Sequence, residues 1–188
     1  THFIFYENGK LRCQDKYING VMQGKSKWFY ENGNIQIISD YENGSKNGKC
    51  EEYYENGVLM SVGENVNGMH NGEWKFYHYN GKLARTGKYV IGILEGEWME
   101  YYENDTLQLK SVVKYKNGLK DGKFIEQYEN GQLKSIGNYS EGLLIGKWYE
   151  YYTNGKLSQI KSYANGVMAG EWKWYRENGE LIQSITYE

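Results

Sequence analysis

The sequence predicts an all-β protein, a single-layer, elongated antiparallel meander of repeated β-hairpins. Three observations lead to this prediction. A pattern of 24 residues recurs along the 188-residue chain. Each copy carries Asn-Gly pairs, the strongest short-range signal for a tight hairpin turn. The residues around these pairs are rich in Tyr, Trp and Ile, which favour strands, and no apolar stripe at helical spacing competes with that pattern.

The repeat is clearest when each unit is started at the glycine two residues before the usual tryptophan. The period is 24 residues except for one of 26, and a partial unit, 1–23, comes first. A lone hairpin is marginally stable, so the copies are expected to stack as one repeat domain, 1–188. The seven further units open at Gly24, Gly48, Gly72, Gly96, Gly122, Gly146 and Gly170.

Each unit reads as two strands joined by the first Asn-Gly, with the second Asn-Gly leading into the next unit. If Asn80-Gly81 is a two-residue type I′ loop, Trp74 lies opposite Gly87, where a missing side chain leaves room for the indole. The same arithmetic places Phe124 opposite Gly137. The irregular unit has Asn104-Asp105 in place of Asn-Gly, and its extra residues near 108–113 are expected to bulge or bend the sheet.

Composition excludes several classes of protein. The chain has 22 Lys and Arg against 24 Asp and Glu with no long run of either, so a nucleic-acid binder with a basic stripe is not expected. No apolar stretch is long enough to predict a membrane span. The chain starts at Thr1, so the compartment stays open: cytoplasmic, or cell surface or periplasm if an upstream signal was removed. Cys13 and Cys50 fall three strands apart, too far for a disulfide.

The consensus G-[KE]-W-x-x-Y-Y-E-N-G-x-L followed by Y-x-N-G resembles the MORN repeats, and more closely the bacterial MORN-variant, antitoxin-like repeats. This resemblance covers about 5–187. It implies elongated sheets of hairpins that act in protein–protein association and, for some members, membrane association, with no catalytic residues. Choline-binding cell-wall repeats also combine Gly, Trp and Tyr in hairpins, but the 24-residue period and the Leu after Asn-Gly favour the MORN variant.

Catalytic and metal chemistry have little support in the sequence. The chain has only three histidines, His2, His70 and His78, and neither His-x-x-x-His nor Cys-x-x-Cys occurs. A row of glutamates at the eighth position of the units reads as the solvated shoulder of each turn. We therefore expect no enzyme activity, no catalytic residues, no metal site and no cofactor.

The aromatic residues remain as the candidate site. They pack between neighbouring hairpins, or form a groove for a peptide, glycan or lipid head group, or do both. The first hypothesis is a scaffold that binds a protein partner through an aromatic sheet face. The alternative is a cell-surface or membrane-associated module that binds cell-wall glycan or lipid. The partner, the face used and the oligomeric state are left open. The candidate residues are Trp74, Trp98, Tyr102, Trp148, Tyr152 and Trp172.

Overall fold

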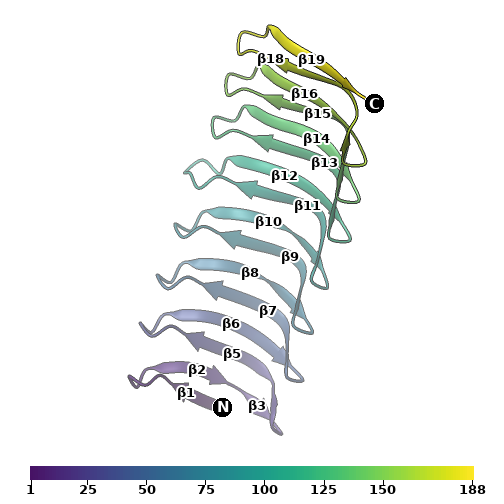
Figure 1. Cartoon of the computed structure of the whole chain (residues 1–188). Helices are drawn as coiled ribbons and strands as arrows, with labels where there is room; N and C mark the ends of the chain where they lie inside the picture. Colours follow the sequence, from purple (N-terminus) through teal and green to yellow (C-terminus); the bar gives the residue numbers. More distant parts are fainter. The chain divides into compact units, whose positions relative to one another are not determined.

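The computed structural model describes residues 1–188, which divide into two compact units, Thr1–Ile93 and Leu94–Glu188. Every regular element is a strand, and seventeen strands follow one another in an antiparallel meander while β3 and β4 form a ribbon of their own (Figure 1). The all-β hairpin meander predicted from the sequence is confirmed. No helix that could cross a membrane is present. We describe each unit by itself.

The first unit holds ten strands. They are β1 (His2–Phe5), β2 (Leu11–Asp15), β3 (Tyr17–Ile18), β4 (Val21–Met22), β5 (Gly24–Phe29), β6 (Ile35–Glu42), β7 (Ser45–Tyr53), β8 (Leu59–Val66), β9 (Met69–Tyr77) and β10 (Leu83–Val90).

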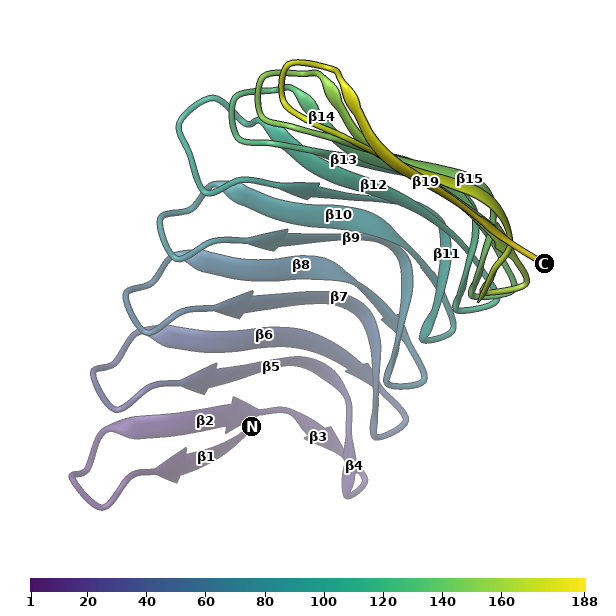
Figure 2. The ribbon, with the colours of Figure 1, turned by 45° about the horizontal axis from the view of Figure 1, so that its top comes forward.

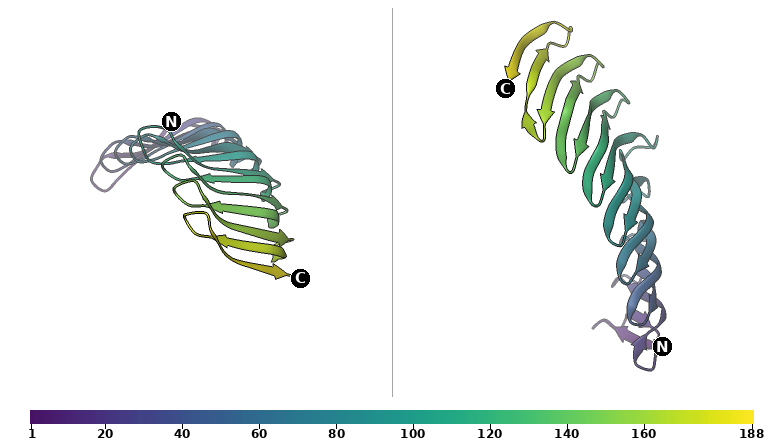
Figure 3. Two further views of the ribbon diagram at one scale, coloured as in Figure 1. Left: turned by 90° about the horizontal axis from the view of Figure 1, so that it is seen from above. Right: turned by 90° about the vertical axis from the view of Figure 1, so that its right-hand side faces the viewer.

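The second unit holds nine strands, and its curved hairpins lie side by side in chain order (Figure 3). They are β11 (Ile93–Tyr101), β12 (Leu109–Lys116), β13 (Leu119–Gln127), β14 (Leu133–Ser140), β15 (Leu143–Tyr151), β16 (Leu157–Ala164), β17 (Val167–Met168), β18 (Gly170–Tyr175) and β19 (Leu181–Tyr187).

The first Asn-Gly of each unit does not form the type I′ turn that we predicted. In the β9–β10 hairpin the Gly81 amide donates to the His78 carbonyl at 2.9 Å, and the His78 amide donates to the Lys82 carbonyl at 2.8 Å. Gly81 has φ +84°, but Asn80 does not have a positive φ. This is a three-residue loop with glycine in the left-handed position. Asn80 is favoured there because its side-chain oxygen accepts from the Lys82 amide at 2.9 Å.

The register beyond this loop therefore shifts by one residue. Leu83 pairs with Tyr77, whereas a two-residue loop at Asn80-Gly81 would place it opposite His78, and the shift is absorbed before Arg85. The pairing of Trp74 with Gly87 is confirmed, as is that of Phe124 with Gly137.

The second turn of each repeat, which is Asn-Gly in most of them, does form the tight two-residue turn. Asn43 and Gly44 have φ +50° and +83°, and the residues on either side of them, Glu42 and Ser45, pair directly. Positive φ at both turn residues matches the natural twist of the flanking strands and is the signature of a type I′ turn.

The strands bend at the glycine that opens each unit. On β6 and β7, Tyr41 pairs with Lys46, but Ser39 pairs with Cys50, so β7 carries two extra residues at this point. Gly48 lies among them with φ +108°, a conformation that side chains disfavour. A bulge of this kind bends the strand. The ends that carry the type I′ turns accordingly fold away from the long strand bodies (Figure 2).

Aromatic side chains fill the inside of the bend. In the first unit the His70 ring stacks on Trp74 with centroids 3.6 Å apart, and Tyr89 meets His70 edge-on at 5.1 Å. In the second unit Trp172 lies between Tyr163 and Tyr187, both at 5.3 Å. We call this side of the strands the inner face and the opposite side the outer face. A single layer of strands can thus bury a core because each hairpin folds over itself.

Tyrosine hydroxyls join neighbouring repeats within each of the two units. The Tyr54 hydroxyl donates to the Tyr77 carbonyl at 2.8 Å, and Tyr128 donates to Tyr151 at 2.7 Å. The same bond recurs from Tyr6, Tyr30, Tyr102 and Tyr152. These tyrosine bonds give neighbouring repeats a fixed offset in addition to their backbone pairing.

The irregular unit does not disturb the sheet. Its two extra residues fall in the loop between Tyr102 and Gln108, whose backbone groups close it with a 3.0 Å bond. Strands β11 and β12 keep the register of the other hairpins, with Trp98 opposite Val113 and Tyr101 opposite Leu109. The register shift between Ser111 and Leu109 is the one that the other hairpins also have. The additional bulge predicted near 108–113 is therefore wrong, because a loop absorbs added residues at less cost than a paired strand.

Candidate binding site

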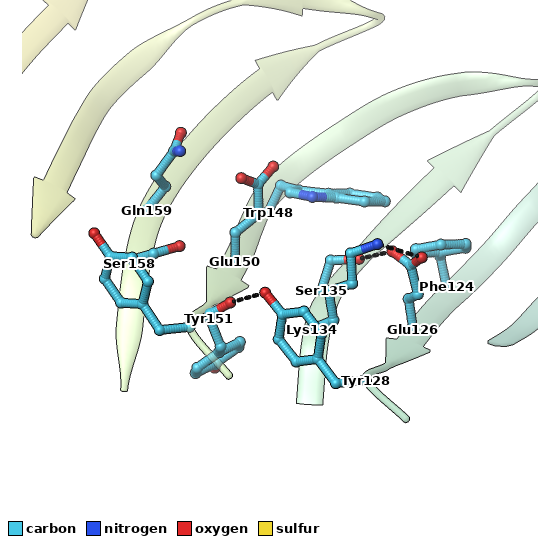
Figure 4. A pocket seen from close by; sticks show the side chains of 11 residues that line it. Phe124, Glu126, Tyr128, Lys134, Ser135, Trp148, Glu150, Tyr151, Ser158 and Gln159 are labelled. Carbon is cyan, nitrogen blue, oxygen red and sulfur yellow. Dashed lines mark hydrogen bonds and ion pairs between the residues drawn. The ribbon is translucent and has the colours of Figure 1, made fainter. Parts of the chain in front are cut away.

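A hollow of about 460 Å³ lies on the inner face of the second unit (Figure 4). It spans four neighbouring strands, β13 to β16, and the loops after β13 and β15. Strand alternation sends every second side chain to this face, as with Phe124 and Glu126 on β13, while the register shifts at the starts of β14 and β16 also bring Lys134 and Ser158 to the hollow. The lining residues are Phe124, Glu126, Tyr128, Lys134, Ser135, Trp148, Glu150, Tyr151, Tyr152, Ser158 and Gln159.

Two stacked aromatic rings form one wall of the hollow. Phe124 and Trp148 have ring centroids 5.1 Å apart with an interplanar angle of 18°. Gly137 makes this possible, because a Cβ at that position would overlap the indole of Trp148. The indole is only partly buried, so the wall presents a flat apolar surface to a ligand.

Two carboxylate side chains, Glu126 and Glu150, line the hollow beside this wall. Glu126 accepts from Lys134 Nζ at 2.9 Å and from Ser135 Oγ at 3.1 Å. The hydrogen bond to Glu126 raises the pKa of Lys134. Glu150 accepts from Lys161 Nζ at 2.6 Å through one oxygen. Its other oxygen, Oε2, has no protein partner and can accept a hydrogen bond from a ligand.

Tyrosine rings border the hollow, but their hydroxyls are already used. Tyr128 donates to the Tyr151 carbonyl, and Tyr152 donates to the Tyr175 carbonyl, both at 2.7 Å. These two tyrosines therefore offer ring surface and hold the repeats together. Their polar ends are not available to a ligand without loss of an inter-repeat bond.

The structure brings two of the six predicted residues, Trp148 and Tyr152, into this hollow. Tyr102 donates to the Gln127 carbonyl at 2.7 Å, which makes it part of the tyrosine ladder. The remaining three are packed in the interior: Trp74 is 0%, Trp98 5% and Trp172 8% exposed.

Sequence reasoning missed the charged members of the hollow. Glu126 and Glu150 occupy the fifth position of their units, and Ser135 and Gln159 the fourteenth. The missed signal was the recurrence of glutamate at the fifth position, since alternation places that residue on the face of the tryptophans.

The structure shows neither clustered metal ligands nor an activated nucleophile. No group of three or more His, Cys, Asp or Glu side chains is placed to hold a metal ion. The Cys13 thiol is buried and donates to Asp15 at 2.8 Å, and burial with this bond raises the pKa of Cys13 to about 12. It is thus a poor nucleophile. Both cysteines are free and buried, Cys13 on β2 and Cys50 on β7.

The fold defines a solenoid-like repeat protein made of β-hairpins. The family model of the MORN repeat variant matches eight segments of the sequence, which together cover most of the chain. The chain therefore belongs to the MORN repeat variant family. The matched segments are 1–19, 22–43, 46–64, 71–90, 94–117, 120–141, 144–165 and 168–188.

Comparison with solved structures finds weak likenesses. The chain is similar to "Crystal Structure of TcdB2-TccC3-Cdc42" at 12% identity with a TM-score of 0.20, covering 98% of this chain and 13% of that one. The chain is also similar to "Crystal Structure of TcdB2-TccC3" at 11% identity with a TM-score of 0.20, covering 96% of this chain and 14% of that one. The chain thus spans a small part of those proteins, and likenesses at this TM-score carry no argument. A search of curated proteins finds no match.

Proposed function

We propose that this protein is a non-catalytic scaffold that holds a peptide segment of a partner protein in the inner-face hollow of its second unit. One observation carries the proposal: the hollow joins a stacked aromatic wall to a carboxylate oxygen, Glu150 Oε2, that has no protein partner. Exposed aromatic surface beside a fixed polar group is typical of a peptide-binding site, where aromatic anchors contribute most of the affinity.

The chemistry of the hollow selects the segment it fits. An apolar side chain can lie on the Phe124–Trp148 wall. A lysine, an arginine or a backbone amide can donate to Glu150 Oε2. Lys134 and Lys161 already form ion pairs with Glu126 and Glu150. The hollow therefore offers a ligand a hydrogen-bond acceptor more readily than a free positive charge. The expected ligand is a short segment with an apolar residue next to a basic one.

The wider aromatic face remains part of the proposal. Trp98, Tyr102 and Trp172 keep the second unit in shape, and Trp74 does so in the first unit. These four residues affect binding indirectly, because they hold the strands that carry the binding residues in place. An antitoxin-like role would be one case of this function, with a toxin as the protein that is held.

Selection from a displayed library of ten-residue peptides tests the proposal. The wild-type protein is expected to enrich peptides with an apolar residue beside Lys or Arg. Ser158→Trp fills the hollow and Glu150→Gln removes its charge, so both should lose this enrichment. Glu100→Gln, at the same position of an earlier unit and outside the hollow, is the matched control and should keep it.

Equal enrichment on wild type and Ser158→Trp would show that the hollow is not the site. The alternative function, a module that binds cell-wall glycan or lipid, predicts a different result: no enriched peptide, and retention on cell wall or liposomes.

A further inference from the structure

The outer face of the second unit carries a continuous apolar row, which we call the outer stripe. Direct cross-strand pairs link Met99 to Val112, Val112 to Ile125 and Ile125 to Ile136. Ile136 then pairs with Tyr149, and Tyr149 with Ile160. The stripe therefore crosses six neighbouring strands, β11 to β16, and is about 24 Å long at the usual strand spacing.

Nothing in the chain covers the outer stripe. Each of its six side chains is partly exposed to solvent. A hollow of about 330 Å³ opens along it, lined by Ile136, Tyr149 and Tyr151 together with Lys123 and Lys147. This hollow lies on the face opposite to the one that holds Trp148 and Glu150, because neighbouring residues of a strand point to opposite sides.

The fold does not require the outer stripe. The first unit has the same hairpins, but its corresponding row alternates between charged and uncharged residues, with Lys27, Glu51 and Lys75 at the places of Met99, Ile125 and Tyr149. Glu51 even forms an ion pair with Lys49 at 2.6 Å. Six apolar side chains in a row on the second unit therefore exceed what the hairpins need for their own stability.

Two lysines without acidic partners border the outer stripe. Lys123 lies opposite Asn138, and Lys147 lies opposite Ser162, and neither lysine makes an ion pair. In the first unit the corresponding Lys25 lies opposite Asp40 and pairs with it at 3.5 Å. Glu171, which feels the charge of Lys147, is already paired with Lys173 at 2.8 Å. The rim of the stripe thus has positive charge to offer a partner.

We propose that the outer stripe binds an amphipathic α-helix of a partner protein that has acidic residues along one border of its apolar face. A helical turn rises 5.4 Å, close to the strand spacing of about 4.8 Å, so successive turns meet successive strands. Carboxylates seven residues apart are about 10.5 Å apart on a helix, and Lys123 and Lys147, two strands apart, are separated by about 10 Å. About 16 residues span the stripe.

The hollow along the outer stripe shares only Tyr151 with the inner-face hollow, so the inference is tested separately from the proposed function. The probe is a synthetic, fluorescently labelled 18-residue peptide with Leu at i, i+3, i+4 and i+7 spacing and Glu at two positions seven apart. Fluorescence anisotropy at low and high salt measures its affinity for the full chain. We expect saturable binding that weakens with salt.

Charge reversal gives the decisive comparison. The double variant K123E/K147E should weaken binding of the acidic peptide at least tenfold, and a peptide with Lys in place of its two Glu should bind this variant better than the wild type. K25E/K49E, which reverses the charges at the same position of two repeats of the first unit, is the matched control and should leave affinity unchanged. Circular dichroism verifies that each variant is folded.

Several results would overturn the inference. One is equal binding of a peptide with the same composition in scrambled order, which would indicate unspecific attraction. Another is equal binding of a peptide interrupted by proline, which would show that no helix is needed. Binding to anionic vesicles but not to the peptide would assign the stripe to a lipid surface, and unchanged affinity in K123E/K147E would remove the role of the lysines.

Discussion

The two units have the same hairpins but different side chains on them. On the outer face the first unit alternates charged and uncharged residues, whereas the second unit has the six-residue outer stripe. At the fifth position of their units the first has Trp28, Glu52 and Phe76, whereas the second has Glu100, Glu126 and Glu150 before Trp174 in its last repeat. The fourth, fifth, fourteenth and fifteenth positions vary between units.

The difference separates residues that make the fold from residues that specify a ligand. Both units keep the bulge glycine, the type I′ turn and the tyrosine bond to the next repeat. These features set the bend and the offset between hairpins. The variable positions lie on the strand bodies, where a change of side chain leaves the backbone unaltered.

The largest effect is expected when the space under a tryptophan is filled. A Cβ at Gly63 would overlap the fully buried indole of Trp74, and a Cβ at Gly137 would overlap the more exposed Trp148. Overpacking of this kind costs about 1–3 kcal/mol. Gly63→Ala should therefore lower the free energy of unfolding in urea more than Gly137→Ala, because Trp148 can move toward solvent.

The double variant Gly63→Ala/Trp74→Leu is the control, since a smaller side chain frees the space. It should cost less than the sum of the two single changes. Additive costs would show that Gly63 and Trp74 do not compete for the same volume.

Loss of a tyrosine hydroxyl should have a smaller effect that is equal in the two units. Tyr54→Phe and Tyr152→Phe each remove one hydrogen bond to the carbonyl of the next repeat. Each should lower the free energy of unfolding by about 1 kcal/mol. Tyr79→Phe, at an exposed ring, is the control and should be silent. A silent Tyr152→Phe beside a costly Tyr54→Phe would break the equivalence of the two units.

Lowering the pH from 7 to 5.5 should reduce the stability of the first unit more than that of the second. Burial lowers the pKa of His70; Lys46 and Arg85 lower it further, and Glu52 opposes them. The unfolded state therefore takes up the proton first, and stability is lost as pH falls below about 6.5, until the folded state is protonated too. All three histidines belong to the first unit.

Hydrogen exchange measures this difference locally. Amide protection in β9 should fall between pH 7 and pH 5.5 relative to that in β15, and His70→Gln should remove the change. An equal loss in both strands would assign the pH effect to other groups.

The smallest effect is expected from a thiol reagent, whose rate of reaction with the two cysteines reports on local opening of the first unit. Cys13 and Cys50 are buried, and the pKa of Cys13 is about 12, so neither should react with an aromatic disulfide reagent at pH 8 in the native protein. Both should react at once in urea. Rapid reaction of one thiol under native conditions would show that the first unit opens locally.

Much of the fold could be predicted from the sequence because the repeat gives the hairpin register. The pairing of Trp74 with Gly87 followed from counting residues. The type of the first turn did not, since Asn-Gly suits both a type I′ loop and a three-residue loop with glycine in the left-handed position. Only the chain around it decides between these loops.

The site was harder to predict than the fold. Trp148 and Tyr152 were expected on a binding surface, and both line the hollow. The bond from Tyr152 to a carbonyl of the next repeat could not be predicted, because a backbone acceptor has no signature in the sequence. Glu126 and Glu150 were overlooked because charge on a strand usually indicates only a solvated face.

The long loop of the irregular unit has a practical consequence. Between Tyr102 and Gln108 the chain is two residues longer than in the other hairpins, yet the Tyr102 hydroxyl still finds its acceptor, Gln127, 25 residues ahead instead of the usual 23. Two additional residues are thus accommodated at the tip of this hairpin without a change in strand register. An epitope tag or a fluorophore attachment sequence placed among residues 103–107 should therefore leave both faces of the second unit free for their ligands.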